Sequence, residues 1–317
     1  MPRLDFVAGY RVVRLLGRGG MADVYEVKHV QLGLRRAMKV FTAEGERSDF
    51  LKSRFLAEGR LLARLDHPRL VKVHDCGVDE ESGRPYLMMD LVLGADGEPH
   101  TLASLHKERK VTEEKLLGWY ADLAEALAYI HSAGIVHRDV KLSNILIDAD
   151  GHAVLSDFGV SRVSDGRLRS ELSIEATMVT DAATAGKIVL GTANYLAPEV
   201  RRGDAATAAS DLYALGVTLF RLLTGVWYEP DTKALGLLDG YDPAWRGIFA
   251  ALLADDPQNR SLPPVSRASR RKWLWAIAVL VVVLAMPLAV WFMLARTSGK
   301  NVPVSDRSAE DLFFYPR

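Results

Sequence analysis

The stretch His137-Arg138-Asp139-Val140-Lys141-Leu142-Ser143-Asn144 decides how the rest of this chain is interpreted. It places a carboxylate, an ammonium group and an amide within one short loop. Asp157-Phe158-Gly159 follows 13 residues after Asn144 and adds a second carboxylate. Two ordered motifs at this spacing argue against a coincidental charged loop, so we expect both to serve one site.

The pattern H-R-D-x-x-x-x-N followed by D-F-G resembles the catalytic and metal-binding loops of protein kinases. Phosphoryl transfer needs a carboxylate that orients the attacking hydroxyl and ligands that hold Mg²⁺ across the phosphates. The resemblance implies that Asp139 is the hydroxyl-orienting base and that Asn144 and Asp157 are metal ligands. It also implies that Lys141 is aimed at the transferred phosphate, as is typical of serine/threonine kinases.

A glycine-rich segment, Gly17-Arg18-Gly19-Gly20-Met21-Ala22-Asp23-Val24-Tyr25, follows an apolar strand expected over residues 12–16. Glycines allow backbone N–H groups to approach phosphate oxygens without a Cβ in the way. Such a loop alone is a weak signal, but this form resembles bacterial kinases, although Ala22 stands where the animal pattern has its third glycine. The resemblance implies nucleotide contacts from Gly17, Gly19, Gly20, Val24 and Ala37.

Lys39 lies in a strand expected over residues 36–40 and, by the resemblance, contacts the α- and β-phosphates. Glu58, in a helix expected from Ser48 to Leu65, is its candidate ion-pair partner, and such a pair can be an on/off switch. The alternative for Glu58 is an ordinary surface glutamate. Gly59 beside it is a poor helix former and is expected to loosen the helix by about 1 kcal/mol.

Residues 70–75 and 86–90 are expected to form two further strands. By resemblance, Met89 guards the rear of the adenine pocket, while Asp90 and Val92 belong to the hinge, whose backbone groups bind adenine. Backbone contacts leave little side-chain signature, so these assignments rest on alignment alone. Residues 94–100 resemble a small loop insertion.

The second half predicts a mainly helical lobe. Thr112 is a good N-cap for a helix over residues 113–132, which Gly134 ends. Short strands are expected over residues 145–147 and 153–155, and helices over residues 211–223 and 244–254. Asp211 resembles the buried residue that braces the catalytic loop, and Arg260 is expected to pair with Glu199.

The segment from Asp157 to Glu199 resembles an activation loop and is rich in Ser, Thr and Ala. Arg138, beside the catalytic aspartate, resembles the arginine that pairs with a phosphothreonine in such loops. Thr180 and Thr184 are the best candidate acceptors. The alternative is an unregulated mobile loop.

Composition narrows the class of protein. The chain has 317 residues with 40 basic and 40 acidic side chains, so nothing in its overall charge indicates a nucleic-acid partner. Cys76 is the single cysteine, which excludes an internal disulfide and fits a reducing compartment. Residues 1–17 contain no long apolar run, and no cleaved signal peptide is expected.

Residues 273–295 carry no charge and are apolar throughout, which is long enough to cross a bilayer core of about 30 Å. A buried core helix of this length and uniformity would be unusual. Basic residues precede the segment more densely than they follow it: Arg267, Arg270, Arg271 and Lys272 against Arg296 and Lys300. The positive-inside tendency therefore predicts a plasma-membrane protein with a cytoplasmic kinase and its C-terminus outside.

The whole resembles bacterial, eukaryotic-like (Hanks-type), membrane-anchored serine/threonine protein kinases. The expected fold is α+β: a small antiparallel-sheet lobe (residues 7–92) and a mainly helical lobe (93–262) form the kinase domain (7–262). A basic linker (263–272), one transmembrane helix (273–295) and a short external tail (296–317) follow.

The resemblance implies ATP and Mg²⁺ or Mn²⁺ as cofactors. It implies proteins with Ser/Thr acceptors as substrates, with another copy of the chain as a candidate in trans. A pseudokinase scaffold at the membrane and a small-molecule phosphotransferase of related fold remain as alternatives.

Overall fold

The computed structural model describes residues 6–42, 48–158, 193–230 and 234–264. The chain divides into two units, residues 1–265 and 266–317. The predicted membrane helix over residues 273–295 lies outside the described residues. Within the described ranges, no helix is both long enough and apolar enough to cross a membrane.

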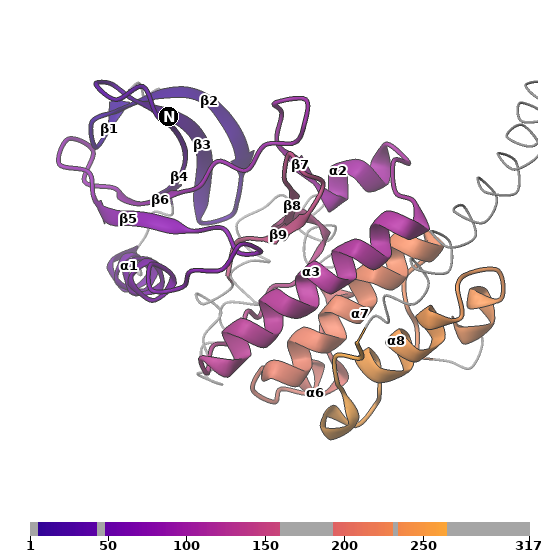
Figure 1. Cartoon of the computed structure of the whole chain (residues 1–317). Coiled ribbons are helices and arrows are strands. Elements are labelled where there is room, and N and C mark those ends of the chain that lie inside the picture. The colour runs from indigo at the N-terminus through magenta and orange to yellow at the C-terminus, as the bar shows by residue number, and fades with distance from the viewer. Residues whose placement is uncertain (1–5, 43–47, 159–192, 231–233, 265–317) are drawn as a thin grey trace, which may run out of the picture. The chain divides into compact units, whose positions relative to one another are not determined.

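The N-terminal lobe is a six-stranded antiparallel sheet with one helix, α1, against it (Figure 1). The strand order is β1-β2-β3-β4-β6-β5. The bounds are β1 (Phe6–Val7), β2 (Tyr10–Arg18), β3 (Ala22–His29), β4 (Arg35–Phe41), β5 (Val73–Val78), β6 (Pro85–Met89) and α1 (Ser48–Leu62).

Side-chain alternation along the strands gives this sheet two apolar faces. Met38 and Met88 belong to the core on one face, away from α1. Leu87 packs on the other face with Phe55 of α1. Lys39 lies directly opposite Leu87 in the register between β4 and β6, so its side chain projects on the α1 face.

Helix α1 ends at Leu62, three residues before the predicted end. Ala63 N still donates to Gly59 O, but the following bonds run from Arg64 N to Leu61 O and from Leu65 N to Leu62 O, which tightens the chain into 3-10 turns. Leu65 remains buried in the core of the second lobe. The apolar residue that suggested a longer helix therefore packs in a turn.

The second lobe is mainly helical, and its two long helices, α3 and α7, lie side by side (Figure 1). The helices are α2 (Leu102–Lys107), α3 (Glu113–Ser132), α6 (Pro198–Arg201), α7 (Ala208–Thr224) and α8 (Ala244–Leu252). Three short strands form an antiparallel sheet, β7 (His100–Thr101), β8 (Ile145–Ile147) and β9 (Ala153–Leu155). Single 3-10 turns are η1 (Leu142–Asn144), η2 (Ala234–Leu238) and η3 (Pro257–Asn259).

Local signals account for the helix boundaries in this lobe. Thr112 caps α3 by accepting a hydrogen bond from Lys115 N, and Gly134 follows the helix with φ +72°. The observed bounds of α3, β8 and β9 equal the predicted ones. Helix α7 begins three residues before its predicted start, because Thr207 and Ser210 form a capping box.

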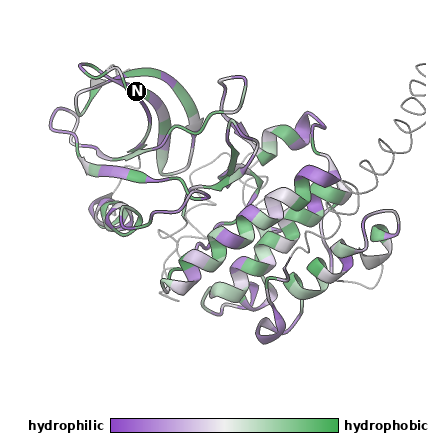
Figure 2. Ribbon diagram, viewed as in Figure 1, coloured by the Kyte–Doolittle hydropathy of each residue, from purple (hydrophilic) through white to green (hydrophobic). Residues whose placement is uncertain are grey.

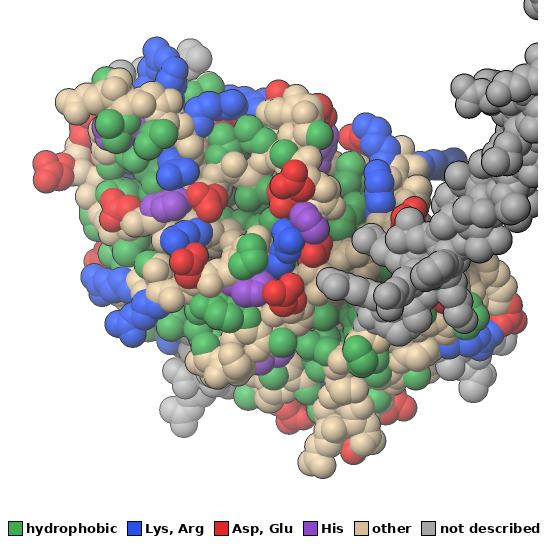
Figure 3. Space-filling view, viewed as in Figure 1, with side chains coloured by type: hydrophobic (Ala, Val, Ile, Leu, Met, Phe, Trp, Pro, Cys, Tyr) green, Lys and Arg blue, Asp and Glu red, His purple; other side chains and the backbone are tan. Residues whose placement is uncertain are grey.

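Helices α3 and α7 both carry hydrophobic and hydrophilic residues along their length (Figure 2), and the buried residues of both helices are mostly hydrophobic. On the face seen in Figure 3, acidic, basic and histidine side chains are interspersed among hydrophobic ones. Beyond Arg260 the described chain, residues 261–264, carries no helix. It runs against α3, where the Tyr120 hydroxyl donates to the carbonyl of Pro263 at 2.7 Å.

Candidate active site

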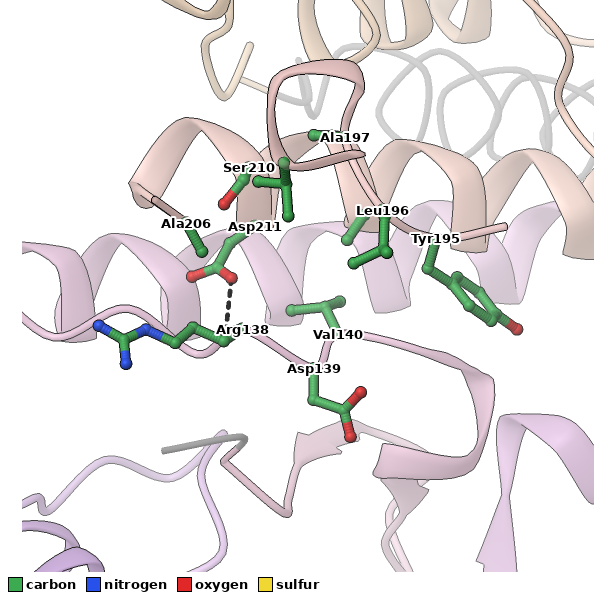
Figure 4. Close-up of a pocket in the computed structure, with 11 residues that line it drawn as sticks. Arg138, Asp139, Val140, Tyr195, Leu196, Ala197, Ala206, Ser210 and Asp211 are labelled. Carbon is green, nitrogen blue, oxygen red and sulfur yellow. Dashed lines mark hydrogen bonds between the residues drawn. The ribbon is translucent and has the colours of Figure 1, made fainter. Parts of the chain in front are cut away.

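The backbone of the segment from His137 to Asn144 is held by one buried carboxylate, that of Asp211 in α7. Asp211 accepts hydrogen bonds from His137 N at 2.7 Å and Arg138 N at 2.8 Å. Figure 4 shows the bond to Arg138, and Asp139 on the opposite side of the loop. Arg138 has φ +68°, a backbone conformation that residues other than glycine rarely adopt. The bonds to Asp211 therefore hold a strained backbone.

His137 is completely buried and has a structural role. Its Nε2 lies 3.1 Å from the carbonyl of Ser156, and Asp139 N donates to its Nδ1 at 3.3 Å. Together these contacts require a proton on Nε2 and none on Nδ1. Burial lowers the pKa of His137, which agrees with a neutral ring. The ring also packs on Phe158, with centroids 4.5 Å apart.

Three polar side chains meet on the outer side of this loop. Lys141 Nζ donates to Asp139 Oδ2 at 2.7 Å, and Asn144 Nδ2 donates to the same oxygen at 2.9 Å. Asn144 also binds the carbonyl oxygens of Asp139 at 2.9 Å and Asp157 at 3.4 Å. These contacts fix the direction of the Asp139 carboxylate, as a group that orients a hydroxyl requires.

Asp157 connects this loop to the N-terminal lobe through an ion pair with Lys39. Lys39 Nζ lies 2.9 Å from Asp157 Oδ1. Burial alone would lower the pKa of Lys39, but Asp157 and Glu58 hold it above its usual value. Burial alone would raise the pKa of Asp157, but Lys39 holds it below its usual value. Both groups are therefore charged at neutral pH.

The predicted ion pair between Lys39 and Glu58 is not formed. Among the residues that the structure describes, the ion-pair partner of Lys39 is Asp157. Glu58 is 4% exposed and lines the same small pocket as Lys39, Asp157 and Phe158, so it is not a surface glutamate. The carboxylate of Asp157, 118 residues from Lys39, competes with Glu58 for one ammonium group, and sequence spacing cannot decide that competition.

Burial raises the pKa of Glu58 to about 7, because Lys39 compensates only part of the cost and Asp157 repels the charge. The stability that the protonated group contributes is present below its usual pKa of 4.5 and is lost as the pH rises through about 7. We expect Glu58→Gln to raise the free energy of unfolding at pH 8 by about 3 kcal/mol, with little change at pH 4.5.

Thermal unfolding of the parent and Glu58→Gln at several pH values measures this difference. Glu81→Gln, at an exposed position in the turn between β5 and β6, is the matched control and should show no pH-dependent difference. If Glu58→Gln were less stable than the parent at pH 8, the charged carboxylate would be stabilising, contrary to this prediction.

The glycine-rich turn joins β2 to β3, and one of its glycines is required by space. Gly17 lies opposite Val24 in the register, and Gly19 N donates to Ala22 O at 3.0 Å. A Cβ on Gly19 would lie 2.8 Å from that same oxygen, whereas Gly17 and Gly20 have open space. Gly19 therefore closes the turn, and the other two leave the backbone uncovered for a phosphate.

The predicted adenine-binding residues line one face of the sheet. Val24 lies opposite Lys39, and Ala37 lies opposite Met89, which places these side chains on the same face as Leu87. The hinge begins where β6 ends at Met89.

Asp90 directs its functional groups back into the N-terminal lobe. Its N–H donates to the carbonyl of Lys72 at 3.0 Å, and its carboxylate lies 2.6 Å from His74 Nε2. The Asp90 N–H and carboxylate are therefore engaged within the protein, and adenine recognition by the backbone of Asp90 and Val92 stays a prediction. The following loop is tied to the sheet through Glu98, which accepts from Arg14 Nη1 at 2.6 Å.

The protein kinase domain model matches residues 10–238, the span that contains every element of this site. The chain belongs to the protein kinase family. Its relatives include a probable serine/threonine-protein kinase of Streptomyces coelicolor, 38% identical over 219 residues, which are 68% of this chain and 30% of that protein. Serine/threonine-protein kinase PknJ of Mycobacterium tuberculosis is 33% identical over 275 residues, or 80% of this chain and 43% of the relative.

The two-lobed kinase fold is also found by structural comparison. A crystal structure of the PknI kinase domain of Mycobacterium tuberculosis is 28% identical, with a TM-score of 0.57 over 81% of this chain and 92% of that one. A second structure of that domain is 26% identical, with a TM-score of 0.59 over 82% and 94% of the two chains. This kinase chain spans about a third to under half of the curated relatives named above.

The donor set of this kinase fits a divalent cation bound together with a nucleotide. Asn144 Nδ2 donates to the backbone carbonyl of Asp157 at 3.4 Å, and Asn144 Oδ1 accepts from the Ser143 hydroxyl at 3.2 Å. No described residue hydrogen-bonds to Asp157 Oδ2. Within the described ranges, no cluster of three or more His, Cys, Asp or Glu side chains forms a complete protein cage. Mg²⁺ typically binds one or two carboxylates and completes its shell with waters and phosphates, so this set suits it.

The end of the activation segment is locked by a buried ion pair. Arg260 donates from Nη1 and Nη2 to the two carboxylate oxygens of Glu199 at 2.6 and 2.9 Å. The Arg260 side chain is fully buried and also stacks on the Tyr213 ring at 4.9 Å. The contact predicted from the sequence is therefore present. The candidate acceptors Thr180 and Thr184 lie outside the described residues.

Sequence reasoning missed His131 of α3, whose Nε2 lies 2.9 Å from Asp211 Oδ2. This contact ties α3, α7 and the catalytic loop together at one carboxylate. His131 and Asp211 are 80 residues apart, so no local sequence pattern predicts their contact. A single histidine near the end of a core helix does not by itself indicate a functional role.

Proposed function

We propose that this chain is a serine/threonine protein kinase that transfers the γ-phosphoryl group of ATP to protein hydroxyls. One observation carries the proposal: Lys39, Asp139, Lys141, Asn144 and Asp157, from three separate motifs, are joined by direct hydrogen bonds and an ion pair. A nucleotide phosphate chain placed there would meet a cation, an oriented base and two metal ligands at once.

In this mechanism Asp139 orients the acceptor hydroxyl and receives its proton. Lys141, 2.7 Å from Asp139, stabilises negative charge on the transferring group. Lys39 binds the nucleotide phosphates. Asn144 and Asp157 would hold Mg²⁺, which when bound neutralises charge across the phosphates.

The proposal is tested by incubating the purified chain with labelled ATP, Mg²⁺ and an added protein substrate, followed by identification of phosphoserine and phosphothreonine. A pseudokinase scaffold would incorporate no label. A small-molecule phosphotransferase would hydrolyse ATP or modify an added metabolite and leave protein unlabelled. The retained Lys39, Asp139 and Asp157 argue against the first alternative, and Lys141 argues against the second.

We also propose that residues 273–295 anchor the kinase in the plasma membrane, with the catalytic unit in the cytoplasm and the C-terminus outside. The uncharged apolar run and the basic residues before it support this arrangement. A reporter that is active only outside the cytoplasm, fused after Arg317, should be active. Digestion of the catalytic unit by protease added to spheroplasts would contradict the topology.

We further propose that phosphorylation of Thr180 or Thr184, by another copy in trans, switches the enzyme on. Arg138 supports this proposal: its backbone is fixed by Asp211, while its Nε is buried and has no hydrogen-bond partner among the described residues. A phosphate adds roughly −1.5 to −2 charges and can form bidentate bonds with an arginine.

The double variant Thr180→Ala, Thr184→Ala should lose most of its activity toward an added substrate after preincubation with ATP. We expect at least a tenfold loss, which corresponds to about 1.4 kcal/mol in the equilibrium between active and inactive enzyme. The parent preincubated without ATP is the control. Full activity of the double variant would show that neither threonine is the switch.

A further inference from the structure

Gly59 of α1 faces the sheet at a point where there is no room for a side chain. A Cβ on Gly59 would overlap Cδ2 of Leu87 and would lie 3.0 Å from Cβ of Cys76. By contrast, a Cβ on Gly118, in the middle of α3, would meet nothing within 4 Å. The two helical glycines have the same intrinsic cost to a helix, but only Gly59 is required by packing.

The overlapping atom, Cδ2, is the end of the Leu87 side chain, so the room around Leu87 decides whether it can move. It is 1% exposed and belongs to the core between α1 and the sheet. It lies opposite Lys39 in the register and lines the small pocket that contains Lys39, Glu58 and Asp157. The overlap caused by an extra methyl group on residue 59 can therefore be relieved in two ways. Either α1 moves away from the sheet, or Leu87 turns into the pocket beside Lys39.

We propose that Gly59 is a positioning residue, whose missing side chain sets the distance between α1 and the sheet and so keeps Glu58 at the Lys39 pocket. Glu58 directly precedes Gly59, so a shift of the helix axis carries its carboxylate along. Packed interiors absorb an added methyl group by backbone movement rather than by compression. The activity effect rests on the proposed kinase function, but the placement of α1 does not.

Cys76 provides a readout of helix position that is independent of activity. It is the only cysteine of the chain, and its Sγ would lie 3.4 Å from a Cβ on Gly59. Cys76 is partly buried, so its thiol becomes more accessible if α1 moves outward. We expect Gly59→Ala in the full chain to react with iodoacetamide under native conditions several-fold faster than the parent. Gly118→Ala should react at the parental rate and unfold at a slightly higher temperature.

Activity provides the second readout. Leu87 and Glu58 line the pocket that contains Lys39 and Asp157, so a shift at residue 59 is expected to displace these two charged groups. Displacement of a catalytic group by about 1 Å can cost on the order of 100-fold in rate, so we expect Gly59→Ala to lower kcat/KM for ATP by at least tenfold. Adding Leu87→Val to Gly59→Ala shortens the side chain that the methyl group overlaps. This double variant should recover slow thiol reaction and most of the activity, relative to Leu87→Val alone.

A parental thiol rate in Gly59→Ala overturns the proposal, whatever the activity. If Gly59→Ala unfolds, the double variant with Leu87→Val must restore a cooperative unfolding transition and the thiol rate of Leu87→Val alone, and failure to do so also overturns the proposal. If the parent itself transfers no phosphate, the kinase function fails, while the thiol rates still decide the role of Gly59.

Discussion

Asp139→Asn should transfer phosphate to protein at a rate about 10²–10⁴-fold below the parent, the range typical for loss of a positioned acid–base group. The amide keeps the size of the carboxylate, so the loop should keep its conformation. It loses the negative charge that Lys141 Nζ binds at 2.7 Å and the base that the acceptor hydroxyl needs. Initial rates with labelled ATP at saturating concentration measure the effect, and binding of a fluorescent nucleotide should change little.

Asp150→Asn, at an exposed position in the turn between β8 and β9, is the matched control and should keep parental activity. Lys39→Ala and Asp157→Ala should reduce the rate comparably but should also weaken nucleotide binding, because each removes a group at the phosphate or metal position. Autophosphorylation of Asp139→Asn at nearly the parental rate would contradict the assignment of this loop as the catalytic centre.

Glu199→Gln should lower the free energy of unfolding by about 3–5 kcal/mol, because breaking a buried ion pair leaves an uncompensated charge. The charge left behind is that of Arg260, whose side chain is fully buried. For a domain of this size the loss corresponds to a decrease in Tm on the order of 10 °C. Glu229→Gln, at an exposed position after α7, should melt with the parent.

The pH dependence of Tm distinguishes the contribution of the ion pair to the stability loss in Glu199→Gln from the contribution of packing. Burial alone would raise the pKa of Glu199, but the hydrogen bonds from Arg260 hold it below its usual value of 4.5. A lowered carboxyl pKa contributes stability above 4.5 that is lost as the pH falls through the folded-state pKa. The difference in Tm between the parent and Glu199→Gln should therefore shrink below pH 4.5. A constant difference would assign the effect to packing alone.

The sequence alone determined the features whose causes are local. The bounds of α3 follow from a cap at Thr112 and a left-handed glycine at Gly134, and β8 and β9 follow from short apolar runs beside the loop. The order and spacing of the motifs identified Asp139, Asn144 and Asp157 as one group. These signals act within a few residues, where backbone geometry leaves few alternatives.

The tertiary structure alone decided which partners those groups have. Lys39 pairs with Asp157, 118 positions away, and not with Glu58. His131 contacts Asp211, 80 positions away, and Asp211 joins it to the catalytic loop. Gly59 shows the largest difference between the two. In the sequence, a glycine at this position predicts a loosened helix. In the structure, α1 approaches Leu87 so closely at Gly59 that a side chain would overlap it. Helix propensity is a property of the residue, but steric room is a property of the neighbouring elements, and these are fixed only when the sheet and the helix pack together.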